Sequence, residues 1–458
     1  MIKYFIDPSN EYRPKPFWFW NGHITQQEID RQLLEMKEKG IGGVFVCPRQ
    51  GMDVPYLSAE WFRLIQYAAS RAEEIGLEVW LYDEFPYPSG MSGGEVTLRL
   101  PQAKQMVLDY LCKECIGGKV SMELGWGNIL YAKACPLSAE GDICYERAVD
   151  LIEEIGNEQP QVIFQESGLT EYNTRRFFTY GPQKKLVCTL PKGKWKLMLF
   201  LERELEDFKY YGCFMDPCNR EAVKAFLETT YEKYKACLGE KFGSQVLGMF
   251  TDETGLLGNL PWSHLLPEEF KKEHGYSLAE NLCALADASY PNAYQIRYDL
   301  YLTIHHLLRE NYHHQISDWC KENHLNYIAE VPGMRMTTQL YSHIVGGDFS
   351  HEKLGKPLNW IYDNGIFNFR HNPRAIASFA RQLGRKYALI ESFHSVGWSM
   401  TLQDAKWMID RLAAAGINMF NFHAFYYTID GLSKCDAPPS QFLQNPYWEH
   451  YKLSLIHI

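Results

Sequence analysis

The sequence predicts an α/β fold, a (β/α)8 barrel of the TIM type with a small antiparallel β domain inserted between strands 3 and 4. Two observations lead to this prediction. First, a unit recurs in which a capped amphipathic helix ends near a glycine and is followed by a short, wholly apolar segment, which is typical of a parallel sheet covered by helices. Second, eight such apolar segments occur in 458 residues, and eight is the number of strands in a TIM barrel.

Three copies of the unit are clear. Thr25 and Glu28 form a capping box before a helix that stops at Gly40, and "IGGVFVCP" follows. Ser58 begins the helix "AEWFRLIQYAASRAEEIG", which "LEVWLYDE" follows. Thr401 begins "LQDAKWMIDRLAAAG", which "INMFNFHAF" follows.

The eight predicted strands are spread over the whole chain. A doubly wound sheet is the alternative fold, but no G-x-G-x-x-G follows any of these segments. The strands are Pro16–Trp20, Gly43–Cys47, Glu78–Tyr82, Val246–Phe250, Leu325–Ala329, Ile344–Phe349, Tyr387–Ile390 and Ile417–Phe422.

Three segments make up the predicted domains. Residues 1–101 hold the first part of the barrel with strands 1–3, and residues 215–458 hold strands 4–8. Between them, residues 102–214 contain alternating runs such as "KKLVCTLPKGKWKLMLFLERE", which predict an inserted β-sandwich-like domain. The last helix begins at "NPYWEHYK" and the sequence stops at "LSLIHI". We therefore expect a C-terminally truncated eighth helix and a fragment of a longer protein.

Composition argues against several classes of partner. The net charge is −10 and no cluster of Lys and Arg is present, so we expect neither nucleic acid nor a membrane surface as a partner. No apolar run is long enough for a membrane span and no signal peptide is recognisable, so we expect a cytoplasmic protein. The twelve cysteines are scattered, and Cys112 and Cys115 form one C-x-x-C without a second pair, which favours reduced structural thiols. The oligomeric state stays open.

Acidic side chains follow several predicted strands. Because a TIM barrel gathers the carboxyl ends of its strands at one face, these side chains are expected to meet there. Crowding raises the pKa of one carboxyl group, which then donates a proton, while an ionised partner activates a water or attacks, and this is the chemistry of glycoside hydrolysis. The acids are Asp83 and Glu84 after strand three, Asp252 and Glu253 after strand four, Glu330 after strand five, Asp348 after strand six and Glu391 after strand seven.

Strands four and seven lie nearly opposite each other in a barrel, so Glu253 and Glu391 form the best-placed catalytic pair. Asp252 is expected to orient or tune its neighbour. Aromatic residues, 14% of the chain, favour flat-faced ligands such as sugars. The predicted sugar-binding residues are Trp20, Asn21, His23, Asp83, Glu84, His394, Trp398, His423 and Tyr426. Packing of the barrel mouth is the alternative role of the aromatic residues, and a buried, satisfied histidine is that of His423.

Long motifs connect the sequence to a known family. "KPFWFWNGHITQQEIDRQLLEMKEKGIGGVFV", "GLEVWLYDEFPYPSGMSGG" and "YALIESFHSVGWSMTLQDAKWMIDRLAAAGINMFNFHAF" resemble segments of the family-106 glycoside hydrolases, the α-L-rhamnosidases, and of uncharacterised relatives. The resemblance implies a TIM barrel with appended β-sandwich domains, inverting chemistry with a glutamate acid and a glutamate base, and a calcium ion near the sugar. Glu391 in "LIESF" matches the base and Glu253 in "MFTDET" is assigned as the acid. Glu330 in "YIAEVPG" is the alternative acid or a calcium ligand.

The predicted function is therefore inverting cleavage of terminal α-L-rhamnosides or glycosides of a related sugar. The residues themselves require no cofactor, and calcium enters only through the resemblance. One alternative is a non-catalytic sugar-binding barrel or an inactive fragment. Another is a divalent-metal barrel enzyme that uses Glu330, Asp348 and histidines. The pairs His305–His306 and His313–His314 fall within a helical stretch, Ala293 to Asn323, in which adjacent residues do not share a face, and no H-x-H follows strand one.

Overall fold

The chain folds as two compact units, and each is described by itself. The computed structural model describes residues 7–158, 163–164, 178–179, 183–206, 212–258, 260–331, 336–348 and 373–456. The barrel unit comprises Met1–Lys104, Lys209–Gly255 and His305–Ile458, and the β unit comprises Gln105–Phe208 and Leu256–Ile304.

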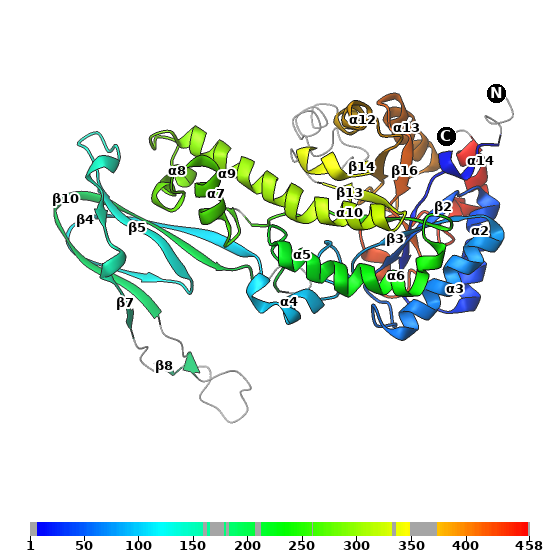
Figure 1. Cartoon of the computed structure of the whole chain (residues 1–458), viewed down its shortest axis with the longest axis horizontal. Helices are drawn as coiled ribbons and strands as arrows, with labels where there is room; N and C mark the ends of the chain where they lie inside the picture. The colour runs from blue at the N-terminus through cyan, green and yellow to red at the C-terminus, as the bar shows by residue number, and fades with distance from the viewer. Residues whose placement is uncertain are drawn as a thin grey trace. The chain divides into compact units, whose positions relative to one another are not determined.

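A parallel sheet forms the barrel unit, and it confirms the predicted TIM-type barrel (Figure 1). Every predicted strand has its counterpart in this sheet, although Phe349, the predicted end of strand six, lies outside the described residues. In their order across the sheet the strands are β16 (Met419–Phe422), β15 (Ala388–Ser392), β14 (Ile344–Asp348), β13 (Asn326–Glu330), β11 (Val246–Asp252), β3 (Glu78–Tyr82), β2 (Gly43–Pro48), β1 (Phe17–Trp20) and β17 (Phe425–Tyr426).

The eighth barrel strand is divided, and its two pieces close the ring. Only two residues separate β16 from β17, yet β16 pairs with β15 and β17 pairs with β1. Trp18 lies opposite Phe425 in the ladder of β1 and β17. The backbone N–H of Lys15 also donates to the carbonyl oxygen of Phe420 at 3.0 Å, so β1 contacts both pieces.

Alternate residues of the strands fill the inside of the barrel. Phe17 and Phe19 of β1 belong to one buried cluster with Phe45, Phe250 and Ile328, which come from other strands. Edge-to-face contacts hold this cluster together, as between the rings of Phe17 and Phe250 at 5.1 Å. The strands are therefore apolar on both faces, because helices cover the outer face.

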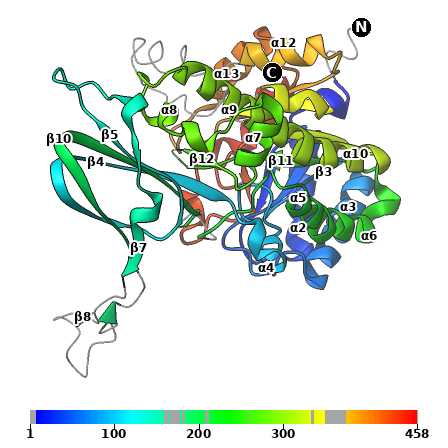
Figure 2. The ribbon, with the colours of Figure 1, turned by 60° about the vertical axis from the view of Figure 1, so that its left-hand side comes forward.

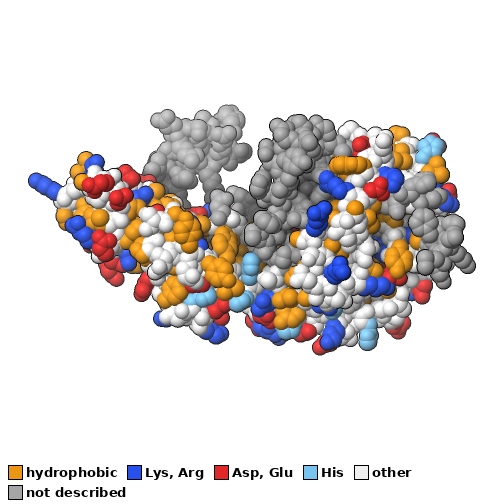
Figure 3. Space-filling model, turned by 90° about the horizontal axis from the view of Figure 1, so that it is seen from above, with side chains coloured by type: hydrophobic (Ala, Val, Ile, Leu, Met, Phe, Trp, Pro, Cys, Tyr) orange, Lys and Arg blue, Asp and Glu red, His pale blue; other side chains and the backbone are white. Residues whose placement is uncertain are grey.

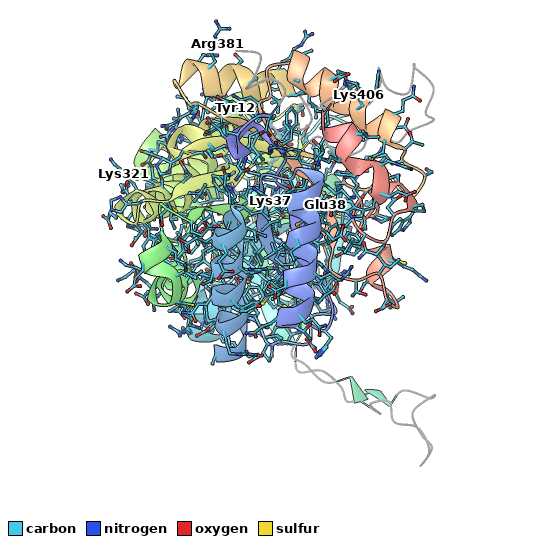
Figure 4. All side chains as sticks on the ribbon, turned by 90° about the vertical axis from the view of Figure 1, so that its right-hand side faces the viewer. Tyr12, Lys37, Glu38, Lys321, Arg381 and Lys406 are labelled. Carbon is cyan, nitrogen blue, oxygen red and sulfur yellow. The ribbon has the colours of Figure 1, made fainter. Side chains whose placement is uncertain are left out.

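Three helices of the barrel unit, α2, α3 and α13, begin at caps that the sequence predicts. The side-chain oxygens of Thr25, Ser58 and Thr401 each accept a backbone N–H in the first turn. Lys37, labelled in Figure 4, donates to the carbonyl oxygen of Gly76 at 2.9 Å, and the figure shows α2 and α3 side by side. The helices are α2 (Gln26–Lys39), α3 (Ala59–Ile75), α4 (Glu95–Arg99), α5 (Arg220–Phe226), α6 (Glu232–Leu238), α10 (His314–Glu322), α12 (Pro373–Gln382), α13 (Leu402–Ala414) and α14 (Tyr451–Ile456).

Two helical segments contain π-helical turns. One turn, η6 (Leu227–Tyr231), joins α5 to α6. The other, η9 (Leu308–His313), joins α9 (Ala293–Leu307) to α10 and makes the predicted helical stretch from residue 293 continuous. Such turns widen a helix locally and occur often beside functional sites.

An antiparallel sheet forms the core of the β unit (Figure 2). Its long strands β4 (Met106–Leu124) and β10 (Gln183–Glu204) pair over most of their length. Leucine side chains such as Leu186, Leu197 and Leu199 fill the core on one face. The other strands are β5 (Asn128–Pro136), β6 (Val149–Asp150), β7 (Ile155–Glu158) and β12 (Pro261–Trp262), with a separate pair β8 (Ile163–Phe164) and β9 (Phe178–Thr179).

The β unit also takes in residues 256–304, which the sequence analysis assigned to the barrel. The reason is that Pro261 and Trp262 form β12, which pairs with β4 at Val107 and Met106. This part of the unit contains α7 (Leu266–His274) and α8 (Cys283–Ala286). An insertion is thus built from two segments of the chain, because one of its edge strands follows β11 rather than β10.

Surface and thiol properties agree with the composition. Figure 3 shows Lys and Arg interspersed with Asp and Glu on the visible face. All twelve cysteines lie in the described residues and are free thiols. Within the described ranges, no helix combines the length and the apolar character that crossing a membrane requires.

Candidate active site

Four consecutive strands of the barrel end in acidic side chains. Asp252 ends β11, Glu330 ends β13, Asp348 ends β14, and Glu391 stands one residue before the end of β15. The strand register places Asp252 beside Glu330 and Asp348 beside Glu391. Parallel strands with this register bring all four side chains to one end of the barrel, as the sequence predicts.

The carboxyl groups are close enough to interact directly. One oxygen each from Asp252, Glu330 and Glu391 lie within 4.8 Å of one another. The same limit holds for one oxygen each from Glu253, Glu330 and Asp348. Glu330 is therefore the carboxyl shared by both groups. We call these five residues the carboxylate cluster.

Burial and crowding change the acidity of the cluster. Burial, together with the negative charges of Glu391 and Asp252, raises the pKa of Glu330 well above the usual range of a carboxyl. Burial and the charges of Asp348 and Asp252 raise the pKa of Glu391 in the same way. This arrangement favours the protonated form of a carboxyl group within the cluster, and general acid catalysis requires such a proton.

Glu253 differs from its neighbours in backbone conformation. It follows β11 and has a φ of 45°, in the left-handed region that non-glycine residues avoid. Such a conformation costs about 1 to 3 kcal/mol and persists only where the surroundings hold it. Here the backbone N–H of Glu253 donates to the carbonyl oxygen of Glu330 at 3.1 Å, which continues the strand ladder by one residue.

Asp252 faces the inside of the barrel. The hydroxyl of Tyr82, a residue of the inner cluster, donates to Oδ2 of Asp252 at 2.6 Å.

Uncharged polar side chains lie beside the carboxylate cluster on the side of strand eight. Asn421 lies beside Glu391 in the register of β15 and β16, and its side chain is fully buried. Among the described residues, neither atom of its amide group has a hydrogen-bond partner. Buried polar atoms nearly always have partners, so an amide of this kind points to a ligand or to water. Sequence reasoning missed Asn421, although a lone amide inside the apolar strand "INMFNF" was the available signal.

Two histidines stand beside this layer, as predicted. The ring of His423 packs against the ring of His394, with 4.8 Å between the centroids, and against the ring of Phe19. Burial, with the positive charge of Arg49 and the nearby His394, lowers the pKa of His423 well below its usual value. His423 is therefore a neutral imidazole, which both donates and accepts hydrogen bonds.

A half-buried ion pair lies on the side of strand two. Arg49 Nε donates to Oδ2 of Asp436 at 2.8 Å, and the guanidinium lies 4.3 Å from the centre of the Phe19 ring. Tyr426 stacks on the same Phe19 ring, and its hydroxyl donates to the carbonyl oxygen of Asp436. Trp398 is 41% exposed and lies edge-on to Tyr426, 6.3 Å between ring centres. Tyr426 and Trp398 thus lie beside the inner layer.

Three residues predicted to bind sugar do not join the carboxylate cluster. Trp20 is fully buried against Trp18 and Trp61, on the outer face of β1, because Phe17 and Phe19 occupy the inner face. The side-chain amide of Asn21 exchanges two hydrogen bonds of 3.0 Å with the backbone of Thr428. His23 is exposed and pairs with Asp53.

Asp83 and Glu84 are fully buried and accept hydrogen bonds from other parts of the protein. Asp83 accepts hydrogen bonds from three hydroxyl groups, and burial raises its pKa to about 7 although these donors oppose the shift. The carboxylate of Glu84 accepts the backbone N–H groups of the loop that follows β3. Burial raises the pKa of Glu84 as well, and the N–H donors oppose this by favouring the ionised form.

The carboxylate cluster also suits a hard divalent cation. Both groups of nearby oxygens come from carboxyl groups alone, the ligand type that Ca²⁺ and Mg²⁺ prefer. Oε2 of Glu330 has no hydrogen-bond partner among the described residues. The donor set therefore fits the calcium ion that the resemblance implies, with Glu330 as its central ligand.

Comparison with known proteins gives one family match. A model of glycoside hydrolase family 106, described as alpha-L-rhamnosidase, matches residues 186–430, which is more than half of the chain. The match spans β11 to β17 and so includes the whole carboxylate cluster. No curated protein matches the sequence.

Solved structures with a similar fold include a rhamnosidase from Novosphingobium sp. PP1Y. It has a TM-score of 0.62 and 17% sequence identity, and the likeness covers 99% of this chain and 60% of that chain. This chain thus spans 60% of the length of that rhamnosidase. An endo-beta-1,4-mannanase from Thermotoga petrophila has a TM-score of 0.39 at 8% identity, covering 98% of this chain and 77% of that chain.

Proposed function

Because the chain belongs to glycoside hydrolase family 106, the alpha-L-rhamnosidases, we propose that it hydrolyses terminal α-L-rhamnosides, or glycosides of a related sugar, with inversion at the anomeric carbon. The observation that carries this proposal is the carboxylate cluster at the carboxyl ends of the strands, in which Glu330 and Glu391 have raised pKa values. Such a cluster supplies both forms that the reaction needs, one carboxyl with a proton and one without.

Glu391 acts as the base in this proposal and Glu253 as the acid. Glu391 removes a proton from a water as the water oxygen bonds to the anomeric carbon. The bond between that carbon and the leaving oxygen breaks, and Glu253 gives its proton to the leaving oxygen. Both residues adjoin Glu330 within the cluster, so they belong to one site.

Spacing counts against Glu330 as the acid. An inverting pair needs about 6.5–9.5 Å between its carboxyl groups, because the attacking water lies between the base and the sugar. Oxygens of Glu330 and Glu391 approach within 4.8 Å, which leaves no such space. Glu330 is therefore better suited to tune the charge of Glu391 or to bind a cation.

A calcium ion would be held by Glu330 with either Asp252 or Asp348, its aspartate neighbours in the two groups of carboxylate oxygens. When bound, it would neutralise part of the negative charge and attract sugar hydroxyls. Asn421 and the neutral His423 offer uncharged donors and acceptors for other hydroxyls of the sugar.

Hydrolysis of a panel of aryl glycosides, followed by NMR, tests the reaction and its stereochemistry. We expect turnover of the aryl α-L-rhamnoside, with β-L-rhamnose as the first product seen. Release of α-L-rhamnose would contradict inversion. Turnover of a different aryl glycoside in the panel, with none of the rhamnoside, would assign another sugar.

Substitution of the acids by glutamine tests the roles. Glu391→Gln should lower kcat by about 10²–10⁴-fold and leave binding of L-rhamnose intact. Glu253→Gln should lose activity on an alkyl rhamnoside, whose leaving group must be protonated. It should retain activity on dinitrophenyl rhamnoside, because dinitrophenolate departs without a proton. If Glu330→Gln shows this dependence on the leaving group and Glu253→Gln does not, the acid is Glu330. Asp53→Asn is the matched control, since Asp53 is exposed and pairs with His23 away from the cluster.

A further inference from the structure

The segment that carries Asp252 and Glu253 is held from the side by the loop of residues 85–94, here called the clamp loop. Ser89 of this loop is fully buried and makes three hydrogen bonds to the segment. Its backbone N–H donates to the carbonyl oxygen of Asp252 at 3.0 Å, and the N–H of Asp252 donates to Ser89 Oγ at 2.8 Å. The hydroxyl of Thr254 donates to the carbonyl oxygen of Ser89 at 2.8 Å.

These bonds begin at the point where the hydrogen-bond ladder between β3 and β11 ends. The last bond of that ladder runs from the N–H of Asp83 to the carbonyl oxygen of Phe250 at 3.1 Å. Beyond it, Ser89 takes over as the neighbour of Asp252. On the opposite side, Glu253 is bonded to the backbone of Glu330. The acid-bearing segment is thus fixed on both sides, which explains how Glu253 keeps its left-handed conformation.

Asp83 sets the direction of the hydrogen bonds at Ser89. The Ser89 hydroxyl donates to Oδ1 of Asp83 at 2.5 Å, so its lone pairs face the N–H of Asp252. Oδ2 of Asp83 accepts the hydroxyls of Thr251 and Tyr231, each at 2.6 Å. Tyr231 lies in the π-helical turn η6, and Thr251 precedes the two acids. Asp83 thereby ties the clamp loop, β11 and η6 to a single carboxyl group.

Glu84 shapes the clamp loop itself. Its carboxylate accepts backbone N–H groups from both ends of the loop, at distances of 2.7 Å for Phe85, 2.9 Å for Gly90, 2.8 Å for Ser92 and 2.8 Å for Gly93, and also from Met91. A carboxylate that accepts so many N–H groups acts as the anion around which the loop folds. Both oxygens of each of the two carboxyl groups accept hydrogen bonds from the protein.

We propose that Ser89, Asp83 and Glu84 are positioning residues for the glycosidase reaction, acting by holding Asp252 and Glu253 in place. The importance of this positioning for catalysis rests on the proposed function, whereas the hydrogen bonds that hold Asp252 and Glu253 in place do not depend on it. Sequence analysis assigned Asp83 and Glu84 to sugar binding. Their hydrogen bonds instead direct both carboxyl groups toward the backbone and hydroxyls of the protein.

Ser89→Ala tests the proposal most directly, because it removes the acceptor for the Asp252 N–H and keeps the backbone bonds of residue 89. We expect kcat on an aryl α-L-rhamnoside to fall about 100-fold, the loss that a shift of about 1 Å causes, with little change in KM. Ser89→Thr keeps the hydroxyl and should retain most of kcat. Ser244→Ala is the matched control, because Ser244 precedes the other end of β11 and its hydroxyl donates to the carbonyl oxygen of Lys241 at 3.1 Å.

Hydrogen exchange at the Asp252 amide gives a readout that needs no catalysis. In the wild type this amide donates to Ser89 Oγ and should exchange slowly, and in Ser89→Ala it should exchange faster while amides of α3 stay unchanged. An inactive wild type with this exchange result would overturn the proposed function but support the clamp. Wild-type kcat in Ser89→Ala would overturn the positioning role. If Ser89→Ala does not fold, Tyr231→Phe provides a second test, because it removes one hydrogen-bond donor to Asp83 and should also lower kcat. A wild-type kcat in Tyr231→Phe would then overturn the positioning role.

Discussion

Carboxyl oxygens of Glu330 and Glu391 lie within 4.8 Å of each other, although β14 lies between the strands that carry them. Glycine at position 346 of β14 helps to explain the contact, since the strand presents no side chain there and the register places Gly346 beside Glu330. Burial raises the pKa of both carboxyl groups, so the pair favours retention of a proton inside the barrel.

The crowding around Glu391 predicts the pH dependence of the reaction. The base must be ionised, so activity is lost as the pH falls through its pKa, and a raised pKa places that loss above the usual carboxyl value of about 4.3. Asp348→Asn removes the neighbouring charge that raises the pKa of Glu391 most, so this pKa should fall and the acidic limb of kcat/KM should move to lower pH. The measurement is the pH profile of residual activity in Asp348→Asn beside that of Asp53→Asn. An acidic limb at the same pH in both variants would contradict the coupling.

Calcium should stabilise the fold by relieving repulsion in the carboxylate cluster. A ligand that binds only the folded state adds about 4 kcal/mol at 1,000 times its Kd, so calcium should raise Tm in a concentration-dependent way. Glu330→Gln should lose this shift, since Glu330 belongs to both groups of nearby oxygens. Calorimetry of chelator-treated protein with added Ca²⁺ provides the measurement. A wild-type Tm that does not respond to Ca²⁺ would count against a calcium site.

Asn421 should contribute to binding rather than to stability. Asn421→Leu replaces a buried amide without protein partners by an apolar side chain of similar size, so Tm should stay equal or rise. Loss of its hydrogen bonds to the sugar should weaken binding by about 1 to 3 kcal/mol, that is about 5- to 150-fold in KM. Steady-state kinetics and thermal melts measure the two effects.

Asn418, the residue just before the same strand, supplies the matched control. Its amide group is used by the protein, accepting the N–H of Ala388 at 2.8 Å and donating to the carbonyl oxygen of Lys386 at 2.9 Å. Asn418→Leu should therefore lower Tm and leave KM unchanged. The opposite pattern in the two variants would refute the assignment of Asn421.

Trp20 should contribute to stability rather than to binding. Its ring is fully buried between Trp18 and Trp61, with 5.4 Å between ring centres in each pair. Trp20→Ala should cost about 3 to 5 kcal/mol of unfolding free energy, as other buried aromatic deletions do. Denaturant titration measures this loss, and KM of the surviving folded enzyme should equal that of the wild type. A changed KM with unchanged stability would support the predicted role of Trp20 in sugar binding.

Barrel topology and the cluster of acids could be predicted because both depend on strand ends. Apolar runs that stop at an acid mark the carboxyl end of a parallel strand, and Glu330, Asp348 and Glu391 follow this rule. The direction of each side chain could not be predicted in the same way. In "FWFW" both faces of the strand are buried, so no polar residue distinguishes inside from outside, and Trp20 was assigned to the wrong face for sugar contact.

Loops set a second limit on prediction. Asp83 and Glu84 follow β3, where strand-end reasoning expects sugar contacts. Their actual partners are Ser89 and the N–H groups of the clamp loop, which depend on how residues 85–94 turn back. Asn421 was overlooked for a different reason, because an amide inside an apolar strand has no charge to mark it.

Closure of the barrel through the divided eighth strand has a consequence for folding. The side-chain amide of Asn21 and the backbone of Thr428, 407 residues apart in sequence, are bonded where β1 meets β17. During synthesis β1 leaves the ribosome long before β17, and its edge stays unpaired on that side until β17 is made. Contacts of such high sequence separation slow folding, and an unpaired apolar edge invites association with other chains. Chaperone dependence during translation is the expected cost of a barrel closed by strands so far apart in sequence.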